Sequence, residues 1–512
     1  MQLCKYFYSI NPIAACMNRF LSFVIVIFFI IVALAPAASA VTPSPQASTS
    51  GTSTPIKHVV NIFMENHSFD NIFGIYPYNN YTTNASLSDN LSRPLNLLGN
   101  NSLLNMLTEV PSGVFTTKDP NEGYIPYHID WNHGKMNGFL NGSGPQGLTY
   151  YSAEQMAPEW DLAQQYGLAD NYYAPQISES SPNHLFYLAG FSPVMNDYGP
   201  PPYVPISQSI FGELSAYNVS WGFYINDTHA TFPDWEYLSG HNAYSSHLQS
   251  WNSFLDQSSN GTLPSVSYVF SQETADTQGP PDNMLDGEMW LLYLINSIEK
   301  SPDWNSTAIF ITYDEFGGFY DQVSPPVLDG VQLGFRIPLI VISPYAKEDY
   351  ISNTEMTHTS LLAFIDYNWN IPALNTLVSY SDIPIDFFDF NLTYGNGMLD
   401  RSPMLFNSSA GFPVPSTIHF GPITDTSGYN FSRIFPMKPQ MPFASLPYNR
   451  TGSSSLNLSE LGFKVYNRVN FGYTPIYETP GFYSILVLSQ VIIAGVIYAS
   501  VRKRGESSGK KH

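Results

Sequence analysis

The chain has 512 residues, of which 44% are hydrophobic and 12% are charged, so it can bury a sizeable core in one large domain or in two to three ordinary ones. Acidic residues outnumber basic residues 41 to 20, which gives a net charge of −21 at pH 7. This charge excludes a general nucleic-acid-binding protein, whose affinity requires a basic surface, and it suits a protein that works in acid.

Residues 1–40 form a predicted secretory signal peptide. Basic residues precede the apolar run FLSFVIVIFFIIVALAPAASA, and Ala38-Ser39-Ala40 fits the small-residue cleavage pattern. The alternative is an uncleaved membrane anchor, because the apolar run is long enough to span a bilayer. Both cysteines, Cys4 and Cys16, lie in this region, so the mature protein is expected to contain no disulfide and no thiolate metal site.

A polar linker rich in proline, serine and threonine at 41–54 leads into a predicted catalytic domain at 55–372. In that domain, apolar runs typical of buried strands alternate with helical patterns. Strands are expected at 56–64, 265–270, 307–313 and 336–343, and helices at 284–300 and 357–369. Near-continuous apolar strands followed by helices indicate an α/β fold with a doubly wound, mainly parallel sheet covered on both faces. Sites in such sheets lie beyond the carboxyl ends of the strands.

The C-terminal part of the chain is predicted to leave this domain and to reach a membrane. Residues 373–480 show little periodicity and are expected to form an irregular or β-rich extension or a stalk. The uncharged run at 482–501 predicts a single transmembrane helix, with a buried core helix as the alternative, and the basic tail at 502–512 is expected to be cytoplasmic. The sequence therefore predicts an extracellular domain anchored at the cell surface.

Acceptor triplets for N-glycosylation occur throughout the chain, and in an exported protein several of them are expected to be used. They begin at Asn80, Asn84, Asn90, Asn141, Asn218, Asn226, Asn260, Asn305, Asn391, Asn407, Asn430, Asn449 and Asn457.

Two polar pairs directly follow apolar strands. Glu65-Asn66 comes after the strand that ends at Met64, and Asp314-Glu315 comes after the strand at 307–313. Carboxylate and amide oxygens are suitable ligands for a divalent cation, and adjacent carboxylates at the mouth of a sheet are best explained by a cation or a shared proton. Gly317-Gly318 would let the backbone come close to a ligand. The alternatives are a turn or helix cap at the first pair and a solvated turn at the second.

The segment SESSPNHLFYLAG (178–190) predicts a helix that begins at Ser180 or Ser181, with Pro182 in its first turn. A hydroxyl there meets unpaired backbone N–H groups, which favours binding of an anion such as phosphate. The alternative is a plain helix-capping serine. Two histidines are further candidates, His128 in a short polar segment and His358 at a helix start, although a single histidine is usually structural or exposed.

Together, these segments resemble the phosphoesterase family that contains bacterial-type phospholipases C and an acid phosphatase, within the alkaline-phosphatase-like superfamily. The resemblance covers residues 58–369. The segments that carry it are, in order, HVVNIFMENHSFDNIFG, HIDWNHGKMNGF, SSPNHLFYLAG, SPDWNSTAIFITYDEFGGFYDQVSPP, GFRIPLIVISPYA and THTSLLAFIDYNW. It implies a doubly wound α/β fold with a metal-assisted phosphoryl-transfer site.

The resemblance also implies a metal site. Its ligands would be Glu65, Asn66, Asp314 and Glu315. Because these ligands all offer oxygen, calcium, magnesium or manganese is favoured over zinc, with the alternative that His128 or His358 joins the ligands.

The remaining roles are implied in the same way. The nucleophile would be Ser180, two positions before Pro-Asn, with Ser181 as the alternative nucleophile or a substrate contact. Asn183 would contact the phosphoryl oxygens or brace the turn. His128 would face the substrate and protonate the leaving group, and His358 would be the histidine that opens the late helix of the site.

One segment departs from the family pattern. SQETADTQGPPDN (271–283) lacks the histidine that the family often has before a Pro-Pro, so one phosphate or leaving-group contact is either missing or supplied by Gln278. Three functions stay open on the sequence. They are an acid-phosphatase-like phosphoesterase that forms a phosphoserine intermediate, a phospholipase C that acts on lipid headgroups, and a non-catalytic surface glycoprotein on a phosphoesterase scaffold.

Overall fold

The computed structural model describes residues 51–76, 103–111, 114–152, 155–197, 204–225, 233–271 and 278–391. The predicted signal peptide, the predicted transmembrane helix at 482–501, the basic tail and most of the extension lie outside these residues. Within them, no helix is both long and apolar enough to cross a membrane.

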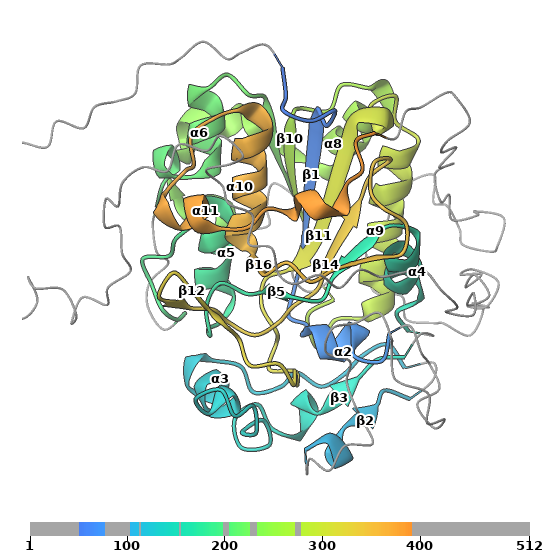
Figure 1. Cartoon of the computed structure of the whole chain (residues 1–512), viewed down its shortest axis with the longest axis vertical. Coiled ribbons are helices and arrows are strands. Elements are labelled where there is room, and N and C mark those ends of the chain that lie inside the picture. Colours follow the sequence, from blue (N-terminus) through green and yellow to red (C-terminus); the bar gives the residue numbers. More distant parts are fainter. Residues whose placement is uncertain are drawn as a thin grey trace, which may run out of the picture. The chain divides into compact units, whose positions relative to one another are not determined.

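An eight-stranded sheet forms the centre of the domain (Figure 1). In spatial order, its strands are β15 (Tyr350–Ser352), β4 (Gly167–Ala169), β14 (Leu339–Ile342), β11 (Thr307–Tyr313), β1 (His58–Met64), β10 (Val266–Phe270), β7 (Trp221–Ile225) and β9 (Leu248–Ser250). All neighbouring strands pair in parallel except at β14, which runs antiparallel to both β11 and β4. The predicted mainly parallel α/β sheet is therefore confirmed, with one reversed strand.

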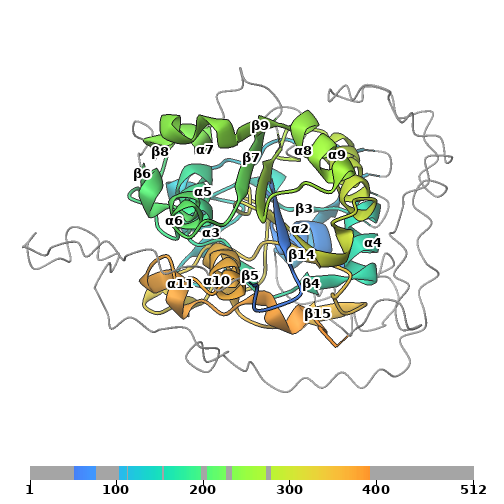
Figure 2. The same ribbon diagram turned by 90° about the horizontal axis from the view of Figure 1, so that it is seen from above.

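The two faces of the sheet are both covered by helices (Figure 2). One face carries α5 (Ser180–Ala189), α6 (Ile210–Ala216), α10 (His358–Trp369) and α11 (Thr376–Tyr380), and the other carries α4 (Ala157–Gln165), α8 (Trp251–Asn260) and α9 (Met284–Glu299). Because both faces are covered, β1, β10 and β11 are buried almost along their whole length, as their near-continuous apolar sequences predict.

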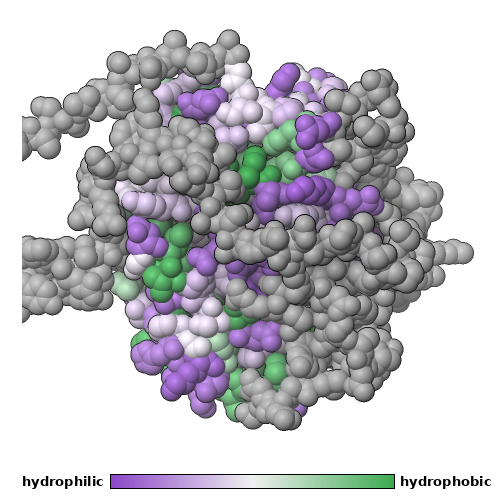
Figure 3. Space-filling view, viewed as in Figure 1, coloured by the Kyte–Doolittle hydropathy of each residue, from purple (hydrophilic) through white to green (hydrophobic). Residues whose placement is uncertain are grey.

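Smaller elements lie around this core. The remaining helices are α2 (Phe69–Phe73), α3 (Tyr124–Trp131) and α7 (Pro233–Glu236). Short strand pairs join β2 (Thr108–Glu109) to β3 (Thr149–Tyr150), β5 (Tyr172–Tyr173) to β16 (Met356–Thr357), β6 (Val204–Pro205) to β8 (Leu238–Ser239), and β12 (Val327–Leu328) to β13 (Val331–Gln332). On the face shown in Figure 3, hydrophilic residues are interspersed with smaller hydrophobic areas.

The sheet domain continues beyond residue 372. Phe387 is fully buried against Gly167 of β4, and the Lys347 N–H donates to the Phe387 carbonyl at 2.8 Å. The described part of the predicted extension, 373–391, is thus packed onto the catalytic domain.

A buried ion-pair network ties α2 to the loop after β11. Arg336 Nη2 lies 2.7 Å from Asp70 Oδ1, and Arg336 Nε lies 3.1 Å from Asp321 Oδ2. The guanidinium also stacks over the Phe69 ring and donates from Nη1 to the Asp170 carbonyl. Since α2 follows Glu65-Asn66 and the loop follows Asp314-Glu315, this network fixes the two chain segments that leave the candidate site.

Candidate active site

The two polar pairs meet because β1 and β11 are adjacent and in register. Met64 pairs with Tyr313, so Glu65 and Asp314 leave the sheet side by side at its carboxyl edge. The Asp314 N–H donates to the Met64 carbonyl at 3.1 Å, and the Asn66 N–H donates to Asp314 Oδ1 at 2.9 Å. The predicted juxtaposition of Glu65 and Asp314 is therefore confirmed.

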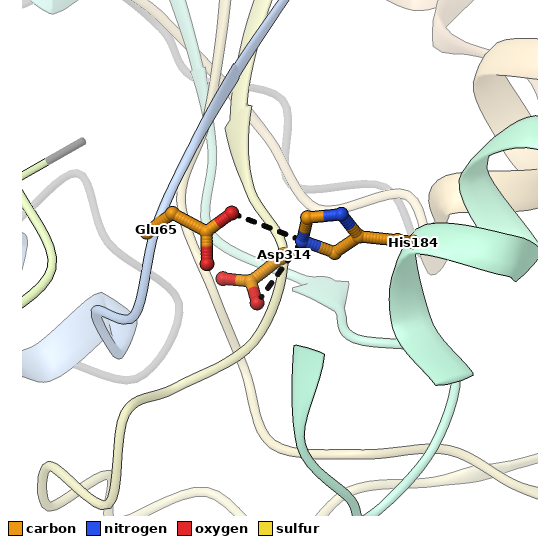
Figure 4. Close-up of side chains that lie close together, drawn as sticks. All are labelled: Glu65, His184 and Asp314. Carbon is orange, nitrogen blue, oxygen red and sulfur yellow. Dashed lines mark ion pairs between the residues drawn. The ribbon is translucent and has the colours of Figure 1, made fainter. Parts of the chain in front are cut away.

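His184 of α5 completes a three-residue cluster with these two carboxylates (Figure 4). Its Nε2 lies 3.0 Å from Glu65 Oε1 and 3.5 Å from Asp314 Oδ2, and one ligand atom of each residue lies within 4.8 Å of the others. Although they are close, His184 Nε2 and Asp314 Oδ2 are buried without a hydrogen-bond partner. A divalent cation fits this arrangement, because nitrogen and carboxylate oxygen atoms converge without satisfying one another.

Burial and mutual charge perturb the ionisation of this cluster. Burial, together with the charge of Asp314, raises the pKa of Glu65 to about 8. Burial alone would also raise the pKa of Asp314, but the adjacent His184 ring and the Asn66 N–H lower it below its ordinary value. The cluster is thus electrostatically coupled, and a bound cation would favour the ionised form of Glu65.

Ser180 is the first residue of α5, as the sequence predicts, and it faces the cluster. Its Oγ donates to Glu65 Oε2 at 3.4 Å. The neighbouring Ser181 is turned elsewhere, because its Oγ lies 2.6 Å from the Tyr237 hydroxyl. Ser180, and not Ser181, therefore lies beside the carboxylates.

Asn66 and Glu315 differ in their suitability as ligands. Asn66 donates through Nδ2 to Glu122 Oε1 at 3.0 Å, and its buried Oδ1 has no hydrogen-bond partner, so this oxygen is available to a ligand. Glu315, in contrast, accepts from the Tyr127 hydroxyl at 3.0 Å and from the Gly317 N–H at 2.9 Å. Glu315 is not a member of the cluster of Glu65, His184 and Asp314, and its role as a metal ligand stays a prediction.

Asn183 braces the turn that holds Ser180. Its Oδ1 accepts from the Gln176 N–H at 3.0 Å, and its Nδ2 donates to the carbonyls of Ser178 and Glu179. Of the two roles predicted for Asn183, the structure supports bracing, since its side chain is fully buried and engaged with the backbone.

The two predicted histidines lie in different surroundings. His358 is buried behind Asp314, with Nδ1 2.8 Å from the Tyr172 hydroxyl and Nε2 3.0 Å from the Asp314 carbonyl. Both ring nitrogens of His358 are engaged, and the ring supports the Asp314 backbone; its predicted catalytic role stays a prediction. His128 lies on α3, half-buried, with Nδ1 2.7 Å from the Tyr124 carbonyl. Within the part of the chain that the structure describes, no hydrogen bond or ion pair joins His128 to the cluster.

Gln278 does not supply the contact expected of it. Its side chain is buried between Glu159, to which Nε2 donates at 2.8 Å, and the Tyr313 hydroxyl, which donates to Oε1. The Gln278 carbonyl faces His67 Nε2 at 2.8 Å. Gln278 therefore braces the chain behind β1 and β11.

The sequence interpretation missed His184 and its partner Asp234. His184 Nδ1 lies 2.7 Å from Asp234 Oδ1, and Asp234 is fully buried. A sequence signal for His184 existed, because it lies four residues after Ser180 in a predicted helix and must share a face with it. Asp234 had no such signal, since only the packing of α7 against α5 brings it near.

Comparisons with known proteins show what this chain is similar to. The sequence model of the phosphoesterase family matches residues 56–372. Phospholipase C A of Mycobacterium tuberculosis is 25% identical over 399 residues, which cover 63% of this chain and 74% of that protein. Non-hemolytic phospholipase C of Burkholderia pseudomallei is 26% identical over 400 residues, covering 64% of this chain but only 57% of that longer protein. A solved structure from Vibrio parahaemolyticus, a protein in the alkaline phosphatase superfamily, matches 52% of this chain and 74% of its own with 12% identity and a TM-score of 0.28.

Proposed function

Because the chain belongs to the phosphoesterase family and is a phosphoric ester hydrolase, we propose that it cleaves its substrate through Ser180 at the cluster of Glu65, His184 and Asp314. The observation that carries this proposal is the 3.4 Å approach of Ser180 Oγ to Glu65 Oε2 at the carboxyl edge of the sheet. It joins a hydroxyl at a helix start to the only cluster of three or more metal-binding side chains found in the described part of the chain.

Ser180 acts as the nucleophile in this proposal. Its Oγ forms a bond to phosphorus while the bond from phosphorus to the leaving alcohol oxygen breaks, and Glu65 Oε2 is placed to accept the Ser180 proton. The N-terminal N–H groups of α5 favour the negative charge of the phosphoryl group. Water then hydrolyses the phosphoserine, which releases the phosphate and restores the hydroxyl.

The leaving alcohol requires a proton, and His128 is the candidate to deliver it. Its Nδ1 is held by the Tyr124 carbonyl, so Nε2 is the nitrogen that can face a substrate. A divalent cation bound by Glu65, His184 and Asp314, with Asn66 Oδ1 nearby, would neutralise charge that develops on the phosphoryl oxygens.

Phospholipids are the substrate class that the comparisons favour over a soluble monoester. The relatives are named phospholipases C, at about 25% identity. In addition, α3 exposes Ile125 and Ile129, which are 62% and 42% accessible, on the same short helix that carries His128 and sends Tyr127 to Glu315. An exposed apolar face beside the site suits a substrate that carries acyl chains.

We extend the proposal to the location of the protein. Secretion and C-terminal anchoring rest on the sequence patterns at 1–40 and 482–501, and a membrane-anchored enzyme would meet lipid substrates directly. Five acceptor asparagines of the glycosylation triplets lie exposed in the described residues, which agrees with an extracellular domain; they are Asn141, Asn218, Asn260, Asn305 and Asn391. Asn66, which also begins such a triplet, is half-buried at the candidate site. Protease treatment of intact cells should remove the domain, and resistance in intact but not in lysed cells would contradict a surface location.

Activity on p-nitrophenyl phosphate and on a phosphocholine lipid, with and without chelator, tests the proposed reaction. Ser180→Ala should abolish turnover of both, whereas Ser181→Ala should retain most of it. Acid quenching during turnover should trap phosphate bound covalently to the parent protein and to Ser181→Ala. This covalent phosphate should be absent in Ser180→Ala. Retained activity in Ser180→Ala would contradict the nucleophile, and inactivity on both substrates with every added metal would favour a non-catalytic glycoprotein.

A further inference from the structure

Asp234 has no role in the mechanism above, yet it contacts His184 of the candidate metal cluster. Asp234 Oδ1 lies 2.7 Å from His184 Nδ1, and Asp234 is fully buried on α7. The edge of the His184 ring also packs against Phe63 of β1, with ring centroids 4.8 Å apart at 74°. The imidazole is therefore held from two sides.

This restraint determines which ring nitrogen faces the carboxylates. An ionised carboxylate only accepts hydrogen bonds, so the Asp234 contact places the imidazole proton on Nδ1. The lone pair of the neutral ring then lies on Nε2, which is 3.0 Å from Glu65 Oε1 and 3.5 Å from Asp314 Oδ2. A lone pair that faces two carboxylates is unfavourable, so Nε2 must either carry a proton or bind a cation that lies between them. A bound metal ion would take the place of that proton.

We propose that Asp234 is a positioning residue that holds His184 Nε2 as a metal ligand, and that this nitrogen makes the site selective for a first-row transition metal such as zinc over calcium and magnesium. The proposal rests on the proposed function only in requiring a cation at this site. It differs from the expectation from the sequence, which favoured oxygen ligands and considered only His128 or His358 as a possible nitrogen ligand.

The chemical reason is the donor set. Calcium and magnesium take oxygen ligands almost exclusively, whereas imidazole nitrogen suits zinc and other later first-row transition metals. Two carboxylates and one imidazole on β1, β11 and α5 form a mixed set. A carboxylate behind a ligating histidine fixes the ring orientation and strengthens the nitrogen as a donor, and losing such a partner typically weakens metal affinity about 10–100-fold.

Metal titration of the full-length protein, stripped of metal with a chelator, tests this proposal without measuring activity. By isothermal titration calorimetry, zinc should bind at least about tenfold more tightly than calcium or magnesium. Asp234→Asn should weaken zinc about 10–100-fold and leave the weaker calcium binding nearly unchanged, since calcium uses the carboxylates. X-ray absorption of the zinc-loaded protein should show one imidazole ligand.

A matched control exists at the opposite end of β1. Asp303 Oδ1 lies 3.7 Å from His58 Nε2, so Asp303→Asn makes the same chemical change beside a histidine that is remote from the cluster. This variant should bind zinc like the parent. Should Asp234→Asn fail to fold, His184→Gln carries the test, because an oxygen in place of the nitrogen should shift the preference from zinc towards calcium.

Three results would overturn the proposal. The first is a parent protein that binds calcium or magnesium as tightly as zinc. The second is unchanged zinc affinity in Asp234→Asn, which would arise if His184 served Ser180 as a base. The third is an equal loss of zinc and calcium affinity, which would mean that Asp234 only maintains the local fold. A parent that binds zinc selectively but hydrolyses no phosphoric ester would refute the proposed function and leave this inference standing.

Discussion

The close approach of Gly317 to Asn66 gives the sharpest test of how the site is held together. Gly317 has φ +61°, and a Cβ added there would lie 2.2 Å from the Asn66 carbonyl oxygen. Asn66 in turn donates from its backbone N–H to Asp314 Oδ1 at 2.9 Å. Gly317 thus lets the backbone approach Asn66 closely, and Gly317→Ala should disturb Asn66 and Asp314 together.

The magnitude follows from two contributions. A left-handed backbone conformation costs alanine about 1–2 kcal/mol. Because Cβ contacts shorter than 3.0 Å essentially never occur, the Asn66 carbonyl must also retreat by about 0.8 Å, and overpacking of this kind costs about 1–3 kcal/mol. We therefore expect Gly317→Ala to lower the free energy of unfolding by about 2–5 kcal/mol. A shift of this size at the site should reduce kcat/KM on the order of 100-fold.

Gly330→Ala is the matched control, because Gly330 also has positive φ, +84°, but a Cβ there would meet nothing within 4 Å. It should lose only the backbone contribution of about 1–2 kcal/mol and keep its activity. Urea denaturation and turnover of p-nitrophenyl phosphate measure both variants. Equal stability losses in the two variants, together with full activity in Gly317→Ala, would refute the reasoning that this contact positions the site.

Three further predictions concern the surroundings of the site. Arg336→Met should lower the free energy of unfolding in urea by about 3–5 kcal/mol, because Asp70 and Asp321 would be left buried without their cation; a loss below about 1 kcal/mol would contradict this. Burial raises the pKa of Glu299 to about 7 from 4.5, so the folded state holds this proton more tightly than the unfolded state, and the resulting stability is present below pH 4.5 and lost as the pH rises through about 7. Glu299→Gln can still accept a hydrogen bond from the Tyr166 hydroxyl but cannot ionise, so the decrease in the free energy of unfolding between pH 4.5 and 8 should be smaller by on the order of 3 kcal/mol in this variant. Thermal unfolding across this pH range measures the difference, and a pH profile equal to that of the parent would argue against a buried protonated carboxyl. Ile125→Ser combined with Ile129→Ser should reduce hydrolysis of phosphocholine vesicles and leave turnover of p-nitrophenyl phosphate unchanged; equal effects on both substrates would exclude a role in lipid contact.

The local pattern of the sequence was sufficient to predict the elements that carry the site. Apolar runs too continuous for an exposed strand indicated β1, β10 and β11, and the helix signals at Ser180 and His358 matched the starts of α5 and α10. The meeting of Glu65 with Asp314 also followed, because carboxyl ends of neighbouring parallel strands share one edge. These features depend on periodicity and chain direction, which a sequence displays directly.

Side-chain partners that come from distant segments could not be found in the same way. Asp234 reaches His184 only because α7 packs on α5, and Glu315 leaves the cluster only because Tyr127 and Gly317 lie where its carboxylate can accept from them. His358 was predicted to be catalytic from its place at the start of the late helix, and the packing of α10 puts its ring behind Asp314, which no sequence pattern indicated. Hydrogen bonds and metal contacts depend on distances of a few tenths of an ångström, and such distances arise only when all the elements are packed together.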